Sequence, residues 1–147
     1  MKIKNKKASF NYEILESLEV GIVLTGAEVK SLRNGRGNLS ESFVKKISGE
    51  YWVVNMEIPR YKYDGNPNYD PTRSRKLLLK RKEMVRLESK MKQGRLSLIP
   101  LSVYSKGKRF KLEIALAKGK KRYEKKRTEK ERDLKRELER EKRKYMI

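Results

Sequence analysis

The fold of this chain is decided by the stretch Gly26-Ala27-Glu28-Val29-Lys30-Ser31-Leu32-Arg33, because the hydrophobic period changes there. Before it, apolar residues alternate as in a half-buried strand, at Leu18, Val20, Ile22 and Leu24. Within it, Val29 and Leu32 stand three residues apart, which places them on one face of a helical turn. The pattern predicts a strand that leads into a short helix, with charged residues facing outward at Glu28, Lys30 and Arg33. It also fits a connecting helix with a solvated face.

The rest of the chain up to residue 117 is mainly β in pattern. Phe10, Tyr12 and Ile14 alternate, and the phase then breaks around residues 15–17, which predicts a bulge or turn between two short extended pieces. The β-rich runs 43–47 and 51–58 flank Ser48-Gly49-Glu50 and predict a hairpin. Two further strands are predicted over 96–103, where Pro100 disturbs the pattern, and over 110–116.

Two segments interrupt this β pattern. Residues 64–72 are dense in turn-forming residues and predict an irregular loop. After it, apolar residues recur at helical spacing and predict an amphipathic helix that ends near Gly94, with its apolar face at Leu77, Met84, Leu87 and Met91. About six short strands with two or three helices fit a closed β-barrel of the oligonucleotide/oligosaccharide-binding (OB) type.

The charge of the chain points to a polyanionic partner. The 147 residues carry a net charge of +21, of which residues 118–147 contribute +8 from fifteen Lys/Arg and seven Asp/Glu. The other 117 residues contribute +13, so both parts are basic. Phosphate neutralisation releases counterions and drives such chains onto nucleic acid. No apolar run is long enough for a membrane-spanning helix and no signal-peptide pattern opens the sequence, so a cytoplasmic protein without a membrane partner is expected.

The composition argues against an enzyme. The chain has no His and no Cys, so a histidine base, a cysteine nucleophile, a disulfide and a Cys-based zinc site are all absent. No phosphate-cradling glycine motif is present, and Glu57, Asp64 and Asp70 have no recognisable metal-ligand spacing. We therefore expect no catalytic residues, no metal and no cofactor.

Several literal motifs, in order along the chain, resemble the SmpB family, the tmRNA-binding proteins of bacterial trans-translation. EVKSLR follows a Gly21-x-x-Leu24-x-Gly26 approach, and Asn38-Leu39-Ser40 comes after it. The family's N-terminal element is matched by Asn5 to Ala8, and its central element by Asp70-Pro71-Thr72-Arg73-x-Arg75-Lys76-Leu77-Leu78-Leu79. Its last element is matched at Ala117, Gly119, Lys120, Lys121 and Tyr123.

The chain departs from the family pattern at three places. Tyr69 stands where the family usually has His or Cys, and Ala115 stands where Gly is common. Glu124-Lys125-Lys126 replaces Asp-Lys-Arg, which keeps the charge signs but loses the bidentate fork of Arg at Lys126.

The resemblance implies two functional parts: residues 1–117 form an OB-like RNA-binding barrel with a basic arm, and residues 118–147 form a basic tail. The barrel is expected to grip the tRNA-like domain of tmRNA, with Glu19 and Lys111 at the RNA surface and Leu78 supporting it from beneath. The implied tmRNA-binding residues are Asn5, Lys6, Lys7, Glu19, Lys30, Arg33, Asn38, Arg73, Arg75, Lys76, Leu78 and Lys111.

The resemblance also implies that the protein, as a monomer, accompanies alanyl-tmRNA and elongation factor Tu to a ribosome stalled on truncated mRNA. The tail is then expected in the decoding centre and empty mRNA channel. Its implied contact residues are Lys118, Gly119, Lys120, Lys121, Tyr123, Lys125, Lys126, Arg127, Lys130, Arg132, Lys135 and Arg136. The alternative is a generic OB-type RNA-binding or ribosomal protein, which composition and strand number alone fit equally well.

The tail sequence predicts disorder in the free protein and a helix on the ribosome. Leu134 and Leu138 are the only apolar residues between Lys125 and Lys144, too few to offset an ordering cost of roughly 1–2 kcal/mol per residue. The pairs Glu131/Lys135 and Glu139/Arg143 nevertheless favour a helix once RNA neutralises the excess charge.

Overall fold

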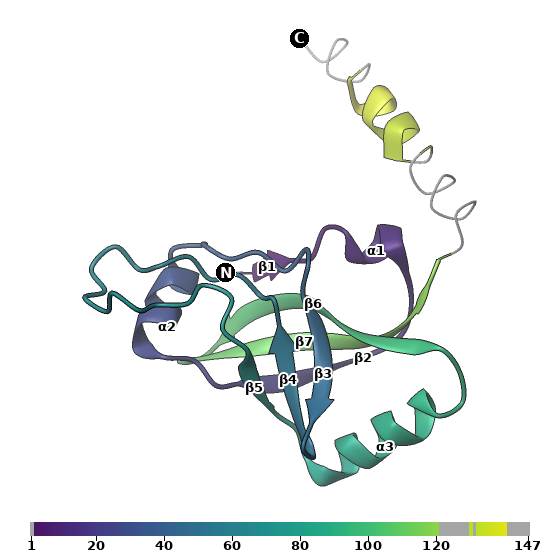
Figure 1. Ribbon diagram of the computed structural model, residues 1–147. Helices are drawn as coiled ribbons and strands as arrows, with labels where there is room; N and C mark the ends of the chain where they lie inside the picture. The colour runs from purple at the N-terminus through teal and green to yellow at the C-terminus, as the bar shows by residue number, and fades with distance from the viewer. Residues whose placement is uncertain (1, 121–129, 131, 141–147) are drawn as a thin grey trace.

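A computed structural model describes residues 2–120, 130 and 132–140 of the chain. Seven strands and three helices follow one another up to Gly119 (Figure 1). In chain order they are β1 Lys2–Lys4, α1 Ala8–Asn11, β2 Tyr12–Ile22, α2 Gly26–Arg33, β3 Phe43–Ile47, β4 Glu50–Val54, β5 Arg75–Leu78, α3 Arg81–Met91, β6 Leu96–Lys106 and β7 Arg109–Gly119.

Six of the strands close into a ring. The hydrogen-bonded order is β6, β3, β4, β5, β2 and β7, and β7 pairs back onto β6, while β1 is added outside β6. All pairings are antiparallel, but they are unequal: β3 meets β6 only at Val44 and Leu98, whereas β6 and β7 pair along their whole lengths. The predicted mainly β fold is thus confirmed, with a ring that is less regular than a simple barrel.

The first long strand is one element with a bulge. β2 pairs with β7 from Tyr12 to Gly21, and the register shifts between Ile14 and Glu16. The predicted bulge at residues 15–17 is therefore present, but the two separate extended pieces are not. Phe10, predicted to lie in an extended segment, belongs instead to the short helix α1.

The helix predicted at residues 26–33 is present as α2, and its start has a chemical cause. Glu28 N–H donates to Thr25 Oγ1 at 3.3 Å, while Thr25 N–H donates to Glu28 Oε1 at 2.8 Å. This reciprocal capping box satisfies two backbone donors that a helix start leaves without partners. The helix ends at Arg33, and Gly35 then adopts φ +75°, which glycine accepts without steric cost.

The predicted hairpin is formed by β3 and β4. Ile47 pairs with Glu50, so Ser48 and Gly49 are the two turn residues, with φ values of +52° and +81°. Two positive φ values match the twist of an antiparallel pair. β4 ends at Val54, earlier than predicted, and the buried Met56 and Ile58 belong to the long loop that leads to β5.

The predicted helix, from Leu77 to near Gly94, is divided between two elements. Leu77 lies in β5, whereas the helix α3 begins at Arg81. The start of α3 is capped by the Lys80 N–H, which donates to Glu83 Oε1 at 2.8 Å. Helical spacing grouped Leu77 with the later apolar residues, although it enters the core from a strand. The helix ends at Met91, so Gly94 is not its capping residue.

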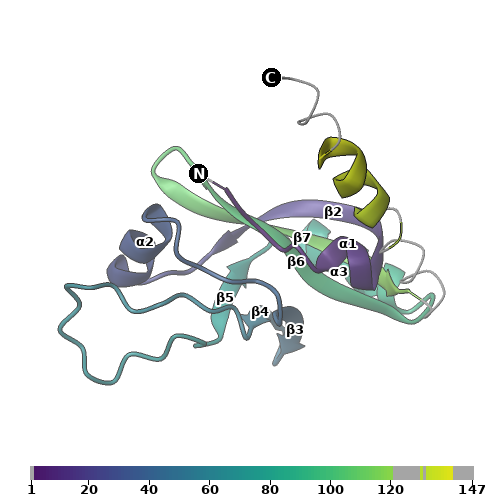
Figure 2. The same cartoon turned by 90° about the horizontal axis from the view of Figure 1, so that it is seen from above.

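The core fills the ring and joins the helices to it. Leu32 of α2 and Leu87 of α3 pack in the same cluster as Val53, Leu112 and Ile114 of the strands. Seen from above, α2 and the loop between β4 and β5 lie at one end of the molecule (Figure 2). The tail leaves from the other end, beside α1, and residues 130 and 132–140 are helical.

Candidate RNA-binding surface

Three strands bring the predicted residues Glu19, Leu78 and Lys111 to one face of the ring. Gly21 of β2 pairs with Leu78 of β5 on one side and with Lys111 of β7 on the other. Directly paired residues in neighbouring strands point to the same face, as do residues two positions apart on one strand. Glu19, two positions before Gly21, therefore shares this face with both partners.

A groove with a volume of about 330 Å³ lies beside this row and is lined by Leu78, Val29 of α2 and residues 108–111 of the β6–β7 hairpin. The family resemblance implied that Leu78 supports the surface from beneath. Leu78 is instead 55% exposed and forms part of the surface itself. Gly21 makes this position possible, because a Cβ atom there would lie 3.2 Å from Leu78 Cβ.

Glu19 is held by two partners from β6. The Tyr104 hydroxyl donates to one carboxylate oxygen, and Lys106 Nζ donates to the other at 3.1 Å. The tyrosine hydrogen bond, followed by that of Lys106, lowers the pKa of Glu19, so the carboxylate is charged at neutral pH. Burial and the bond to Glu19 raise the pKa of Tyr104 to about 12. Glu19 can therefore only accept hydrogen bonds, such as those from base amino or ribose hydroxyl groups.

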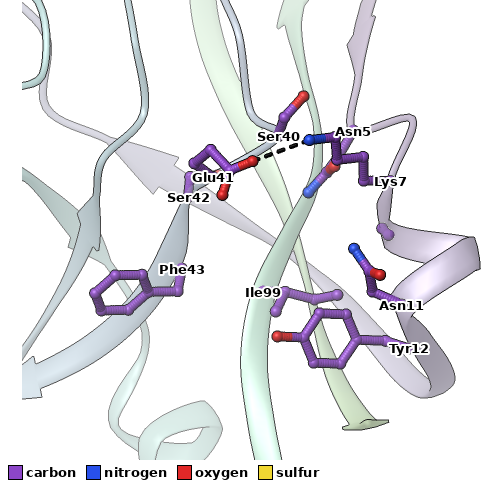
Figure 3. Close-up of a pocket in the computed structure, with 10 residues that line it drawn as sticks. Asn5, Lys7, Asn11, Tyr12, Ser40, Glu41, Ser42, Phe43 and Ile99 are labelled. Atoms are coloured by element: carbon purple, nitrogen blue, oxygen red, sulfur yellow. Dashed lines mark hydrogen bonds and ion pairs between the residues drawn. The ribbon is translucent and has the colours of Figure 1, made fainter. Parts of the chain in front are cut away.

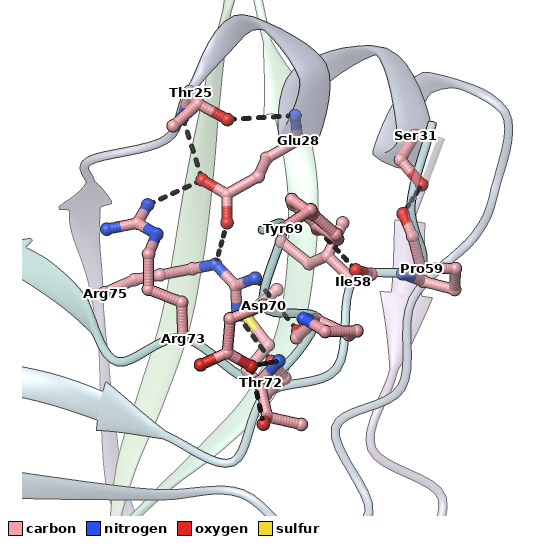
Figure 4. A network of polar contacts seen from close by, with 12 residues as sticks. Thr25, Glu28, Ser31, Ile58, Pro59, Tyr69, Asp70, Thr72, Arg73 and Arg75 are labelled. Atoms are coloured by element: carbon pink, nitrogen blue, oxygen red, sulfur yellow. Dashed lines mark hydrogen bonds and ion pairs between the residues drawn. The ribbon is translucent and has the colours of Figure 1, made fainter. Parts of the chain in front are cut away.

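Glu28, predicted to face solvent, is instead fully buried. Figure 4 shows the polar side chains and backbone groups that meet it. Its Oε1 accepts from Arg73 Nη2 at 2.6 Å and its Oε2 accepts from Arg75 Nε at 2.5 Å. Burial alone would raise the pKa of Glu28, but the bonds from Arg73, the Thr25 backbone and Arg75 outweigh it, and the pKa is lowered. A buried carboxylate needs such cationic partners.

Arg75, predicted to bind RNA, is also fully buried. Besides Glu28 it donates to the carbonyls of Met56 at 2.5 Å and Pro71 at 3.0 Å. Its donors therefore serve the protein, and we remove Arg75 from the RNA-contacting set. The sequence held one signal of this network, the Thr25-x-x-Glu28 capping box; nothing local linked Glu28 to an arginine 47 residues away.

The network fixes the ends of the loop between β4 and β5. The Tyr69 hydroxyl donates to the carbonyl of Ile58 at 2.5 Å, and Ser31 Oγ of α2 donates to the carbonyl of Pro59 at 2.7 Å (Figure 4). Tyr69 thus uses its hydroxyl to hold the backbone of the same loop. The predicted irregular loop, residues 64–72, is present as part of the longer β4–β5 loop, which is bonded to α2 through Pro59 and to β5 through Pro71.

The other predicted body residues occupy different places. Lys30 and Arg33 are exposed on α2, and Arg73 keeps 40% of its side chain exposed beyond its bond to Glu28. Lys76 Nζ forms an ion pair with Glu50 at 3.0 Å. Asn38 has a local structural role, because its Oδ1 accepts from Ser40 N–H at 2.8 Å and its backbone pairs with Glu57.

The predicted residues Asn5, Lys6 and Lys7 lie directly before α1, at the end of β1 away from Tyr104. Asn5 is fixed to β6, with its Nδ2 donating to the carbonyl of Pro100 at 2.8 Å. Lys7 Nζ pairs with Glu41 at 3.0 Å next to a small pocket that Asn5 and Tyr12 also line (Figure 3). Lys6 is exposed. The structure therefore does not bring these three residues to the groove that holds Leu78 and Lys111.

The tail starts from this same end. Lys118 and Gly119 complete β7, and Lys120 N–H donates to the carbonyl of Asn11 at 2.9 Å. Arg132 Nη2 donates to Ser9 Oγ at 3.0 Å, and its guanidinium lies 5.5 Å from the Phe10 ring. Lys130, Lys135 and Arg136 are exposed. Lys121, Tyr123, Lys125, Lys126 and Arg127 lie outside the described residues.

The described residues show neither a metal-binding cluster nor a membrane-spanning helix. No group of three or more His, Cys, Asp or Glu side chains there is arranged to hold a metal ion. No helix in the same ranges has the length and apolar character needed to cross a membrane.

The chain is similar to known proteins along almost its whole length. Residues 2–144 match the family described as "SmpB protein". An "SsrA-binding protein" of Sulfurihydrogenibium sp. (strain YO3AOP1) is 54% identical over 135 residues, which cover 92% of this chain and 89% of that one. An "SsrA-binding protein" of Agrobacterium fabrum is 48% identical over 138 residues, covering 93% and 86%.

The fold is also similar to a solved one. A chain in the structure described as "tmRNA-SmpB: a journey to the center of the bacterial ribosome" superposes with a TM-score of 0.68 and 42% sequence identity. The match covers 82% of this chain and 85% of that one.

Proposed function

Because this chain belongs to the SmpB family, we propose that it binds the tRNA-like domain of tmRNA and brings alanyl-tmRNA to stalled ribosomes. There the incomplete peptide is tagged by trans-translation. The names of its relatives refer to SsrA binding, and its structural neighbour is described with tmRNA and the bacterial ribosome, which supports this proposal over a generic OB-type RNA-binding protein.

The observation that carries the proposal is the convergence of Glu19, Leu78 and Lys111 on one face around Gly21. The three side chains supply a hydrogen-bond acceptor, an apolar contact and a cation, from strands far apart in the sequence. Lys111 attracts phosphate, while the charged Glu19 accepts only from particular RNA groups. Such a mixture gives selectivity beyond the attraction of the net charge of +21.

The tail completes the proposed mechanism. The body, residues 1–117, holds tmRNA, and the basic tail, residues 118–147, enters the decoding centre and the mRNA path that a truncated message leaves empty. Elongation factor Tu is engaged through alanyl-tmRNA, and one copy of the protein acts as a monomer in the cytoplasm. α2 and the β6–β7 hairpin, which line the groove, lie at the end of the molecule away from α1 and the start of the tail (Figure 2), and this separation suits a factor that joins two partners.

The test is selective binding by the purified full chain. We expect the protein to bind the tRNA-like domain of tmRNA more tightly than an unrelated hairpin of equal length, and Glu19→Ala to reduce this preference. A pulldown from cells should recover tmRNA as the dominant RNA. Equal affinity for both RNAs, with bulk ribosomal RNA in the pulldown, would show that the protein is a generic RNA-binding protein.

A further inference from the structure

From the loop between β4 and β5 we infer a second RNA contact, a base-stacking site formed by Tyr61 and Tyr63. This inference rests on the proposed function and extends it to a segment to which the sequence assigned no binding role. We call residues 59–64 the tyrosine loop. In both views it projects beside α2, away from the C-terminal helix (Figures 1 and 2).

The exposure of Tyr63 is the first observation. At 75% it is the most exposed of the large hydrophobic side chains in the described ranges, ahead of Val85 at 59%. Its ring meets that of Tyr61 edge to face, with centroids 5.5 Å apart and an interplanar angle of 68°. With Tyr63 75% exposed, much of its ring is accessible to solvent beside this pair, and an accessible aromatic ring is what an unpaired base stacks on.

Cations surround this pair. Lys30 Nζ of α2 lies 5.4 Å from the centre of the Tyr61 ring, and Lys62 Nζ lies 5.5 Å from the centre of the Tyr63 ring. Arg60 follows Pro59 and donates from Nη2 to the carbonyl of Asp64 at 2.8 Å, which closes the loop. A stacking surface flanked by cations fits single-stranded RNA, because each base carries a phosphate within reach of such side chains.

The loop is presented in a fixed position. At its base, Ile58 N–H donates to the carbonyl of Pro71 at 2.9 Å, and Ser31 Oγ holds the carbonyl of Pro59. The buried Arg75 donates from Nη2 to the carbonyl of Pro71 at 3.0 Å. These bonds fix the base of the loop that carries the exposed Tyr63, so less ordering cost remains to be met when RNA binds.

The position of the loop connects it with the groove. Lys30, which contacts the Tyr61 ring, is the neighbour in sequence of Val29, which lines the groove beside Leu78. α2 thus lies between the two surfaces. An RNA whose paired part occupies the Glu19–Lys111 face can extend an unpaired segment across α2 onto the tyrosine loop.

The experiment measures the affinity of full-length variants for three RNAs. The probes are the tRNA-like domain of tmRNA, an unstructured oligoribonucleotide and a blunt RNA duplex without unpaired bases. Tyr63→Ala should lower the affinity for the first two about tenfold and leave duplex binding unchanged. Tyr63→Phe should keep the wild-type affinity because the ring face remains, whereas Tyr63→Leu should behave like Tyr63→Ala. The matched control is Val85→Ala, an exposed apolar residue on α3, which should change nothing.

The outcomes separate the two proposals. Since Tyr63 is exposed, its variants should unfold at the wild-type temperature, and the salt dependence of binding should keep its slope because no cation is removed. The stacking site is wrong if Tyr63→Ala binds both unpaired probes as the wild type does, or if Tyr63→Phe loses as much affinity as Tyr63→Ala. A wild-type protein that does not prefer the tRNA-like domain over the duplex contradicts the proposed function, while the oligoribonucleotide still decides the stacking site.

Discussion

Arg75 of β5 donates from Nε to Glu28 of α2 at 2.5 Å, and neither side chain is exposed to solvent. The pair joins the two most recognisable motifs of the chain, EVKSLR and the segment that starts at Asp70. With the Met56 and Pro71 carbonyls, it links a helix, a strand and a long loop through one guanidinium. Both motif residues are therefore buried in the protein, where they fix the geometry beneath the candidate RNA-binding surface.

We expect Arg75→Ala to destabilise the protein by about 3–5 kcal/mol, because it leaves the Glu28 carboxylate buried with one fewer partner. Urea unfolding followed by the fluorescence of Trp52 measures this effect. The matched control is Arg86→Ala, whose ion pair with Glu16 lies at the surface. It should cost less than about 1 kcal/mol. Similar losses for both variants would contradict a special role of the buried pair.

The same pair predicts an acid-sensitive fold. The pKa of Glu28 is lowered from its usual value of 4.5 in the folded protein. A carboxyl shifted in this direction stabilises the fold above the unfolded pKa, and that stability is lost as the pH falls through the folded pKa. Stability measured from neutral pH downward should therefore fall less steeply in Glu28→Gln than in the wild type. Glu41→Gln, which alters an exposed pair with Lys7, should keep the wild-type slope.

Removing the cation of the groove tests the phosphate contribution. Lys111→Ala should weaken binding to the tRNA-like domain by about 1 kcal/mol or more and reduce the slope of affinity against salt by about one unit. Titrations at several salt concentrations measure both quantities. Lys82→Ala, an exposed lysine on α3, should leave the slope unchanged. An unchanged slope in Lys111→Ala would place this lysine outside the RNA contact.

The contact between Gly21 and Leu78 predicts a compensating pair of substitutions. Gly21→Ala places a Cβ atom 3.2 Å from Leu78 Cβ, so it should destabilise the protein by about 1–3 kcal/mol and displace Leu78 from the groove. Adding Leu78→Ala removes the side chain whose γ and δ carbons crowd the new methyl group, and should recover part of that stability. RNA affinity should stay low in the double variant, since the apolar contact is lost. Strictly additive stability losses would mean that the two positions are not coupled.

A shortened chain tests the division between body and tail. β7 runs to Gly119 and Lys120 N–H bonds to Asn11, so a truncation after Lys120 removes most of the proposed tail and keeps these contacts. A chain ending at Lys120 should fold with wild-type stability and bind the tRNA-like domain, yet fail to support tagging on stalled ribosomes. Normal tagging by this chain would show that the tail is dispensable. The disorder of the tail before it meets the ribosome stays a prediction, which backbone NMR of the free full chain can test.

Much of the local structure could be predicted because it depends on near neighbours in the sequence. Period-two alternation predicted β7 and most of β6, a Ser-Gly turn predicted the β3–β4 hairpin, and the change of period at Gly26 predicted α2. Literal motifs then indicated the family and, through it, Glu19, Leu78 and Lys111. The sequence by itself thus determined these longer elements, the excess of positive charge and the kind of partner, but not β1, α1 or β5.

Tertiary structure alone decided which side chains are available to that partner. Helical spacing placed Glu28 outward, and the approach of Arg73 and Arg75, 45 and 47 residues along the chain, makes its burial favourable. The family resemblance implied a position for Leu78 beneath the surface. In β5, however, Leu77 points into the core, so Leu78 points outward, opposite Gly21. No local pattern distinguishes Tyr63 from other loop residues, and its exposure depends on a loop whose base is bonded to Ser31 and Pro71. In each case the deciding partner lies far along the chain, and a local pattern carries no information about contacts between distant residues.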